Sequence, residues 1–211
     1  MTDWPTAAAG IATAAGTLIL AGATFSSIRS AQRATRATEA ALLAGIRPVL
    51  TPSRLEDPMQ KVSFIDDHWV NLPGGRAVVE VTDEAIYLVM SVRNVGNGLA
   101  VLDRWDLVPD RVQTERSNSD VGGFRRLSRD IYVPAGDLGF WQGALRDPAD
   151  PLFDATRAAI SERGTLTIDL LYGDHDGGQR TISRFACRPV GEKDWMATVA
   201  RHWNLDRPNP R

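Results

Sequence analysis

The stretch Ala85–Val92, which reads AIYLVMSV, decides the fold. Leu88 and Met90 fall on one face of an extended chain here, and Tyr87 and Val89 fall on the other. Side chains that alternate with a period of two over about four to eight residues indicate a β-strand. Because both of its faces are apolar, we expect this strand to lie at the centre of a sheet.

Other short apolar runs predict further strands, because Gly, Pro, Asn and Asp separate them. The runs are Val49–Thr51, Lys61–Ile65, Ala77–Val81, Leu99–Leu107, Ile131–Val133, Leu138–Trp141, Thr165–Tyr172 and Arg180–Cys187. The loop Asp174–Gly178 should join the last two runs as an antiparallel hairpin. In the fourth run, the side chains expected to share one face are Leu99, Val101, Trp105 and Leu107.

Two short helices are expected to interrupt the strands. One covers Pro151–Arg163, and the other follows the helical spacing of Trp195, Val199 and Trp203. Roughly seven to nine short strands with turns between them indicate a mainly β domain over residues 47–211, an antiparallel β-sandwich of Ig-like architecture. The Cys–Trp–Cys pattern of true Ig domains is absent from the sequence. We expect the segment around Trp203 to dock on this sandwich or to meet a partner.

The N-terminal part of the chain has a different texture. No charged residue occurs from Trp4 to Ile28. A helix over this run of about 25 residues would be about 37 Å long, enough to cross a hydrocarbon core of about 30 Å. We therefore expect a transmembrane helix over residues 4–28 and a helical stalk over residues 29–46. A cleaved signal peptide and a soluble helix stay open as alternatives, although the chain begins without Lys or Arg and the run lacks a polar face.

Basic residues follow the uncharged run. Arg29, Arg33 and Arg36 lie on its C-terminal side, whereas the short tail before it carries only Asp3. An excess of Lys and Arg stays on the cytoplasmic side of a membrane, so we expect a single-pass protein of the plasma (inner) membrane with a cytoplasmic domain. The three arginines are candidate contacts to anionic lipid headgroups of the bilayer. The opposite orientation, with an extracytoplasmic domain, is the alternative.

Two spacings along the predicted helix bear on self-association. Ala8, Ala12 and Gly16 lie four apart, and small residues at that spacing let helices approach closely in lipid, so they could support a homo-oligomer. A second set follows alternating spacings of three and four, as a heptad seam does. It consists of Ile28, Ala31, Thr35, Thr38 and Leu42. A seam that is mostly Ala and Thr is too weak to hold a coiled coil unaided, and a solvated helical extension is the simpler interpretation.

Composition excludes several classes of function. The formal net charge is −2 and the pI is about 5.9, so nothing indicates a nucleic-acid partner. The single Cys187 rules out an intrachain disulfide, and there is no Cys/His cluster with zinc spacing. The densest basic cluster is a possible contact to a membrane or an acidic partner, although a solvated loop is the simpler interpretation. It comprises Arg125, Arg126 and Arg129.

Three patterns carry candidate chemistry. Two carboxylates and an imidazole at Asp174–Asp176 could hold a metal ion, but Asp and Gly are also what a tight hairpin needs. Cys187 with His175 or His202 could form a thiol–imidazole pair, but a cysteine in an apolar strand usually behaves as a small hydrophobe. The loop Asn94–Gly98 joins strand to strand, whereas phosphate-binding glycine loops lead into a helix. We therefore expect no catalytic, cofactor or metal site.

The order of motifs resembles a broad class of uncharacterised bacterial membrane-anchored proteins. The resemblance lies in the entry strand Arg47–Leu50, in an N-x-G-x-G-x-A turn at Asn94–Ala100, and in the late strand Leu170–Asp174. It implies a β-sandwich behind an N-terminal anchor and assigns no catalytic residue. The expected function is a membrane-anchored interaction or scaffold module with an unidentified protein partner. An extracytoplasmic binding or envelope protein is the alternative, and a metal-dependent protein using Asp174–Asp176 is a third.

Overall fold

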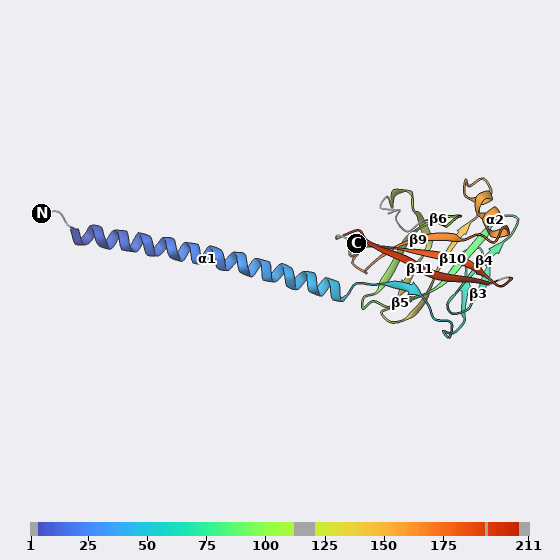
Figure 1. Ribbon diagram of the computed structural model, residues 1–211, viewed down its shortest axis with the longest axis horizontal. Helices are drawn as coiled ribbons and strands as arrows, with labels where there is room; N and C mark the ends of the chain where they lie inside the picture. The colour runs from blue at the N-terminus through green and yellow to red at the C-terminus, as the bar shows by residue number, and fades with distance from the viewer. Residues whose placement is uncertain (1–3, 112–120, 193, 207–211) are drawn as a thin grey trace. The chain divides into compact units, whose positions relative to one another are not determined.

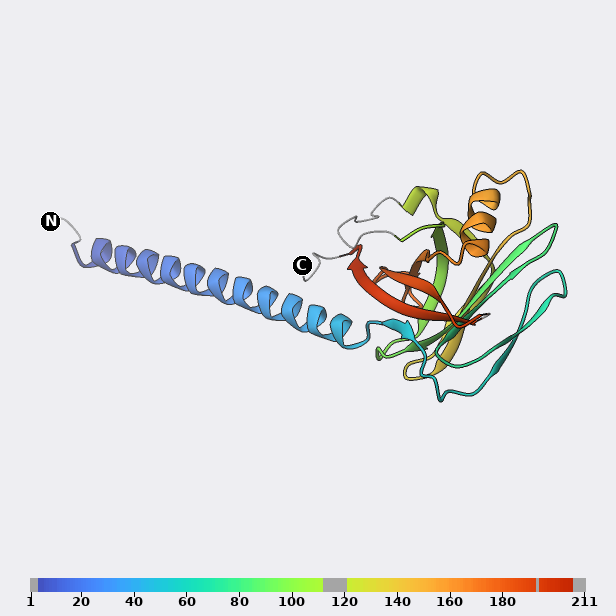
Figure 2. The same ribbon diagram turned by 45° about the vertical axis from the view of Figure 1, so that its right-hand side comes forward.

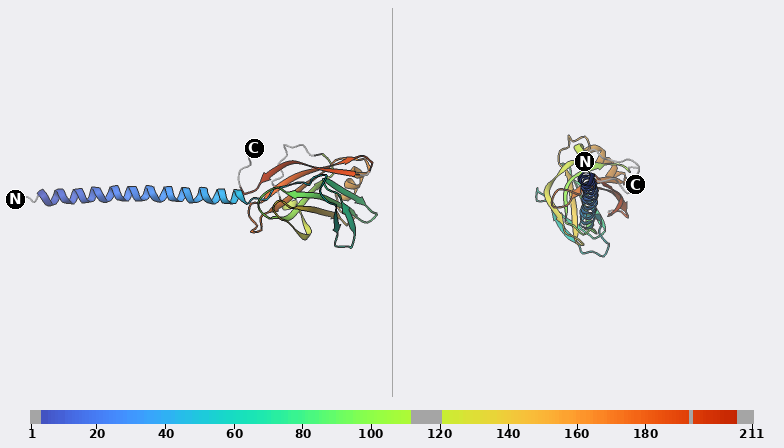
Figure 3. Two further views of the ribbon diagram at one scale, coloured as in Figure 1. Left: turned by 90° about the horizontal axis from the view of Figure 1, so that it is seen from below. Right: turned by 90° about the vertical axis from the view of Figure 1, so that its left-hand side faces the viewer.

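The computed structural model describes residues 4–111, 121–192 and 194–206, and the chain divides into two compact units, residues 1–45 and 46–211. The first unit is one unbroken α-helix, α1, Trp4–Gly45, in every view (Figures 1 and 3). The predicted stalk is therefore helical, as expected. Side chains of α1 are described from Thr17 onward, Ile19 excepted, and all of these residues are exposed. The small residues Ala8, Ala12 and Gly16 lie outside the side chains that are described.

The transmembrane prediction has no support from the described residues. Among them, no helix is both long and apolar enough to cross a membrane. After the run Leu18–Leu20 the helix contains mostly Ala, Gly, Thr and Ser, and Arg29 and Arg33 follow within a few turns.

The second unit is a mainly β domain with strands of three to eleven residues (Figure 1). Its elements are β1 (Leu50–Pro52), β2 (Gln60–Ser63), β3 (Trp69–Leu72), β4 (Arg76–Val81), β5 (Ile86–Asn94), β6 (Ala100–Val108), η1 (Val121–Gly123), β7 (Arg125–Val133), β8 (Leu138–Leu145), α2 (Phe153–Ser161), β9 (Leu166–Gly173), β10 (Thr181–Val190) and β11 (Asp194–Asn204). All of the predicted strands are confirmed to within a few residues except that β7, β8 and β10 are longer. The strand β3 was not predicted.

The stretch Ala85–Val92 forms the central strand β5, as predicted. β5 pairs antiparallel with β8 along its whole length, with β4 over its first half and with β1 at its end. Its even-numbered side chains, from Ile86 to Val92, enter the main core inside the sheet. Tyr87 and Val89 enter a second core, which the hairpin β2–β3 covers from outside. Burial on both faces explains why this strand is apolar throughout.

Nine of the described strands form one curled sheet, and β2 and β3 form a separate two-stranded sheet (Figure 2). Hydrogen bonds join nine of the described strands in the order β1-β5-β4-β11-β10-β9-β6-β7, with β8 on the other side of β5. The antiparallel, mainly β prediction is confirmed. The pair of separate sheets that defines an Ig-like sandwich is not formed by the described strands, because β4 bonds to β11 and closes the gap between them.

The C-terminal segment is a strand, not the predicted helix. β11 pairs with β10 over its whole length. Trp195 and Ala197 are buried in the main core, whereas Trp203, beyond an irregularity in the register, is buried in a separate cluster. The apolar residues of Asp194–Asn204 fit both a helical and an alternating pattern. The long ladder with β10 selects the strand. The other predicted helix, Pro151–Arg163, is confirmed as α2 with Phe153 buried in the main core.

A fragment covering residues 46–211 is expected to fold without α1, because the three clusters of buried apolar residues in the described part of the chain lie after Ile46. Far-ultraviolet circular dichroism should show a β spectrum, and urea unfolding should be cooperative. A fragment without a cooperative transition would contradict the division into two units.

Candidate functional site

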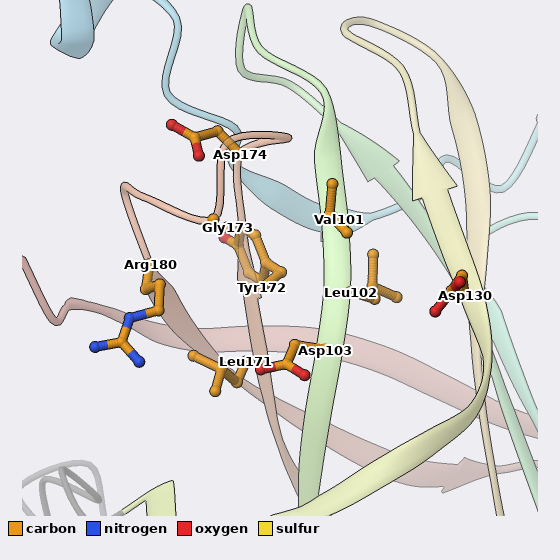
Figure 4. A pocket seen from close by; sticks show the side chains of 10 residues that line it. Val101, Leu102, Asp103, Asp130, Leu171, Tyr172, Gly173, Asp174 and Arg180 are labelled. Carbon is orange, nitrogen blue, oxygen red and sulfur yellow. The ribbon is translucent and has the colours of Figure 1, made fainter.

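A cavity of about 220 Å³ opens between β6, β7, β9 and the loop that joins β9 to β10 (Figure 4). Its lining residues are Val101, Leu102, Asp103, Asp130, Leu171, Tyr172, Gly173, Asp174, Gly177 and Arg180. The apolar members come from the paired strands β6 and β9, and the charged members are Asp103 of β6, Asp130 of β7, and Asp174 and Arg180 of the loop.

A bulge in β6 shapes this cavity. Leu102 is opposite Tyr172 of β9 and Arg104 is opposite Leu171, so Asp103 is an extra residue without a partner in the ladder. A bulge bends its strand and re-aims the following side chains. It also shifts the alternation, so Ala100 and Leu102 face the core in place of the predicted Leu99 and Val101.

The rim of the cavity carries more negative than positive charge. Asp103, Asp130 and Arg180 are exposed, and Figure 4 shows Arg180 and Asp130 on opposite sides of β6 and β9. The carboxylate of Asp174 is buried, where it accepts hydrogen bonds from the Gly178 backbone N–H at 2.8 Å and from Gln179 Nε2 at 3.2 Å. Three carboxylates and one guanidinium among the lining residues favour a ligand that carries a positive charge.

The loop Asp174–Asp176 is a hairpin loop, as predicted. The Asp174 carboxylate accepts a hydrogen bond from the Gly178 N–H inside the loop. His175 and Asp176 are exposed, and His175 Nε2 lies 3.3 Å from Asp176 Oδ1. In the described part of the chain, no group of three or more His, Cys, Asp or Glu side chains could hold a metal ion. Because Asp174 is turned into the loop, the metal alternative finds no assembled ligand set among these residues.

The thiol–imidazole alternative is not assembled either. Cys187 is buried in the main core, and burial raises the pKa of its thiol to about 12. The ladder places Cys187 opposite Ala197, whereas His202 is opposite Ser183, four residues further along β10. At about 3.3 Å per residue, this puts the cysteine and histidine roughly 13 Å apart along the strands. His175 lies exposed in the loop before β10.

A buried chain of hydroxyl groups ends on His202. Tyr172 Oη accepts the Leu50 N–H at 3.1 Å and lies 2.8 Å from Ser183 Oγ, which lies 2.6 Å from His202 Nδ1. Tyr172 and Ser183 are fully buried, so this chain links β1, β9, β10 and β11 rather than meeting a substrate. Burial lowers the pKa of His202 below its ordinary value of 6.5.

Stability is therefore expected to fall as the pH drops below about 6.5, the ordinary pKa of histidine. The unfolded chain takes up a proton at His202 from about pH 6.5 downward, whereas the folded protein resists it until the pH falls through its lowered pKa. One such proton contributes at most about 1.4 kcal/mol per pH unit. Urea unfolding of the wild type and of His202→Asn measures it, and the variant should show a flatter pH dependence. Equal slopes would contradict the lowered pKa. Asp150, whose hydrogen bonds from Arg125 hold its pKa low, stays ionised throughout.

The three arginines of the predicted basic cluster lie on β7 and point to different faces of this strand. Arg125 donates two hydrogen bonds to Asp150, at 2.6 and 2.9 Å, and its guanidinium lies 5.9 Å from the Trp105 ring centroid. Arg129 donates to Ser63 Oγ of the β2–β3 hairpin at 3.2 Å. Arg126 points the other way and is exposed. Two of the three arginines thus join parts of the domain, and a contact to a membrane or partner stays a prediction for Arg126.

Trp203 docks on the domain rather than being free to contact a partner. It is 3 % exposed and packs with Phe124, Leu171 and Ile182 on the outer face of β9–β11. The guanidinium of Arg184 lies 4.7 Å from its ring centroid. Trp203 is therefore unavailable as a partner contact. The remaining predicted contacts, Arg29, Arg33 and Arg36, are exposed on α1.

The Asn94–Gly98 loop holds the entry of the chain into the domain. Asn94 Oδ1 accepts the N–H groups of Val49 and Gly96, and Asn94 Nδ2 donates to the carbonyls of Gly98 and Val133. A Cβ added at Gly98 would lie 1.8 Å from the carbonyl oxygen of Ile46. The glycines are there because the backbone of the entry segment lies against them, so no ligand is needed to explain this motif.

Sequence reasoning missed the role of Arg47. Its side chain is 8 % exposed and donates to Gln179 O, Thr181 Oγ1 and Asn204 Oδ1 at 3.1–3.3 Å and to Asp206 Oδ2 at 2.6 Å. It thereby ties the start of the domain to the ends of β10 and β11. A basic residue directly before Pro48 gave no signal of this, because the partners are more than 130 positions away.

No family model matches the chain, and neither does any curated protein. Among solved structures, a protein from Archaeoglobus fulgidus is similar at 12% identity with a TM-score of 0.25, over 61% of this chain and 93% of the other. An X-ray structure of a Northeast Structural Genomics Consortium target is similar at 10% identity with a TM-score of 0.22, over 81% of this chain and 92% of the other. Similarity at this level carries no argument about fold or function.

Proposed function

We propose that the protein is a non-enzymatic interaction module, in which α1 is the assembling element and the β domain is the binding element. One observation carries this proposal. Every described side chain of α1 from Thr17 onward is exposed, including the large apolar residues Leu18 at 74%, Phe25 at 62% and Leu42 at 65%.

An exposed helix of this length needs a partner for physical reasons. Helices in proteins owe most of their stability to packing of an apolar face, and propensity alone holds them only marginally. Fully burying one Leu or Phe side chain contributes roughly 1.5–3 kcal/mol. Contacts to Leu18, Phe25 and Leu42 therefore offer several kcal/mol to any surface that covers α1.

The cavity beside β6 is the candidate binding element of the β domain. Its apolar floor and acidic rim suit a ligand with an apolar part and a positive charge, such as a basic side chain on a partner polypeptide. Such a ligand would require no catalytic group, in keeping with a binding role.

Static light scattering tests the role of α1. The full chain is expected to have a molar mass well above the 23.0 kDa of one copy, and the fragment 46–211 is expected to be monomeric. A matched control is the full chain with Leu18 and Phe25 changed to Gln, which keeps the helix but removes its largest exposed apolar groups. A monomeric full chain at all concentrations would overturn the assembling role.

A scaffold held at the cytoplasmic face of a membrane is a second candidate. It is favoured by Arg29, Arg33 and Arg36, which follow the uncharged run, because each basic residue near an anionic surface contributes about 1 kcal/mol. Flotation with phosphatidylserine vesicles and with neutral phosphatidylcholine vesicles tests it. Binding to the anionic vesicles alone, lost when the three arginines become Gln, is the expected result. Equal flotation of the triple variant would contradict it.

A further inference from the structure

We infer that the partner of α1 is the α1 of a second copy of this chain, packed parallel and in register along the seam Ile28, Ala31, Thr35, Thr38 and Leu42. This inference rests on the proposed function and names the partner of the same helix. Three features of α1 carry it: a hollow on the seam, an apolar flank beside the seam, and the placement of the charges.

The hollow has the form that a coiled-coil contact needs. Ile28, Ala31, Gln32 and Thr35, with Arg36 at its edge, line a depression on the helix surface. The first four of these residues have the spacing i, i+3, i+4 and i+7, which is the spacing of the four residues that receive one side chain of a facing helix. Ala31 and Thr35 have the smallest side chains among the residues that line this depression.

The hollow of one helix can receive the residue at the centre of the same hollow on a second copy of α1. In a parallel, in-register pair, the residue at the middle of such a hollow faces the equivalent hollow of the other helix. The residue in question is Ala31, whose methyl group is small enough to enter with the two backbones close together. In a pair of α1 helices, the Ala31 side chain of each copy can therefore occupy the hollow of the other copy, and no other chain is needed at this level.

The flank makes the seam stronger than its Ala and Thr content suggests. The seam extends toward the N-terminus through Thr17, Ala21 and Thr24 with the same spacing. Leu18 and Phe25 lie directly beside this extension, so the apolar stripe widens from two to three positions per heptad. Both side chains are exposed, at 74% and 62%, and a second helix over the seam would cover part of each.

The charges agree with this pairing. All seam positions from Thr17 to Leu42 are uncharged. Arg33 falls on the side of α1 away from the seam, Arg29 stacks on Phe25 and Arg36 lies at the edge of the hollow, so none of the three arginines occupies a seam position. A parallel pair thus brings no arginine against its equivalent across the contact.

Cysteine cross-linking of the full chain tests the register. Ala31→Cys and Thr38→Cys each place a thiol on the seam, and Arg33→Cys places one on the outer side as the matched control. The native Cys187 does not compete, because it is buried with a pKa of about 12. Copper–phenanthroline in air oxidises two thiols to one disulfide while oxygen is reduced. A disulfide forms readily only where the Cα atoms lie within about 7 Å.

Both seam variants are expected to give at least about tenfold more disulfide-linked dimer than Arg33→Cys, because pairing holds their thiols at a high effective concentration. Cross-linking at both positions excludes an antiparallel pair, in which the same residue meets itself at only one level. Equal yields in all three variants would overturn the inference. A molar mass above one copy without cross-linking at Ala31→Cys and Thr38→Cys would overturn the seam and leave the proposed function intact. A monomeric full chain would overturn both.

Discussion

Replacing Arg184 with alanine is expected to lower the free energy of unfolding by about 3–5 kcal/mol, the cost of leaving a buried charge without its partner. Arg184 and Asp169 lie opposite each other on β10 and β9, with 3% and 2% of their side chains exposed. Two parallel hydrogen bonds join them, from Nε at 2.7 Å and from Nη2 at 2.6 Å. The change also removes the guanidinium that stacks on Trp203.

Urea unfolding of the fragment 46–211 measures this loss. The matched control is the double variant Asp169→Leu with Arg184→Met, because replacing both partners of a buried ion pair by apolar residues of similar volume is often neutral. The double variant should therefore recover most of the stability that Arg184→Ala loses. A loss below about 1 kcal/mol in the single variant would mean that the pair is not desolvated in solution.

Replacing Gly98 with alanine is expected to cost about 3 kcal/mol or more, at the upper end of the range for overpacked sites. The added Cβ would lie 1.8 Å from the carbonyl oxygen of Ile46 and 2.9 Å from its carbonyl carbon. Both are backbone atoms, so no side chain can turn away to make room. The entry segment would have to move, and with it the hydrogen bonds of Asn94 to Val49 and Gly98.

Thermal unfolding compares Gly98→Ala with Gly123→Ala in the same fragment. Gly123 has no atom within 4 Å of an added Cβ, so its variant should stay within about 0.5 kcal/mol of the wild type. If the two variants unfold at the same temperature, the entry segment does not lie against the glycines.

Local patterns predicted the β domain well where one period dominates. Ala85–Val92 alternates and is buried on both faces, so its position at the centre of the sheet followed from its side chains. The segment Asp194–Asn204 satisfies both a helical and an alternating pattern, and only its ladder with β10 selects the strand. In β6, the bulge at Asp103 breaks the alternation, so counting from Leu99 assigned the wrong face to the first half of the strand.

The residues that close the domain carried little local signal. Arg47 and Asn94 act through partners far away in the sequence, and the charged lining of the cavity comes from separate strands and a loop. The heptad seam of α1 is visible in the sequence, where its Ala and Thr content indicates only a weak contact. The exposure of Leu18 and Phe25 beside it, and the hollow around Ala31, are what the helix itself adds.

The ion pair between Arg47 and Asp206 has a consequence for protein engineering. Because these two side chains meet at 2.6 Å, Arg47 at the start of the β domain lies beside Asp206, the last residue that the structure describes. A domain with adjacent ends can be inserted into a surface loop of an unrelated host protein without separating the two ends of that loop. The same closeness allows the old ends to be fused by a short linker and new ones to be cut between β6 and β7, which would produce a circular permutant.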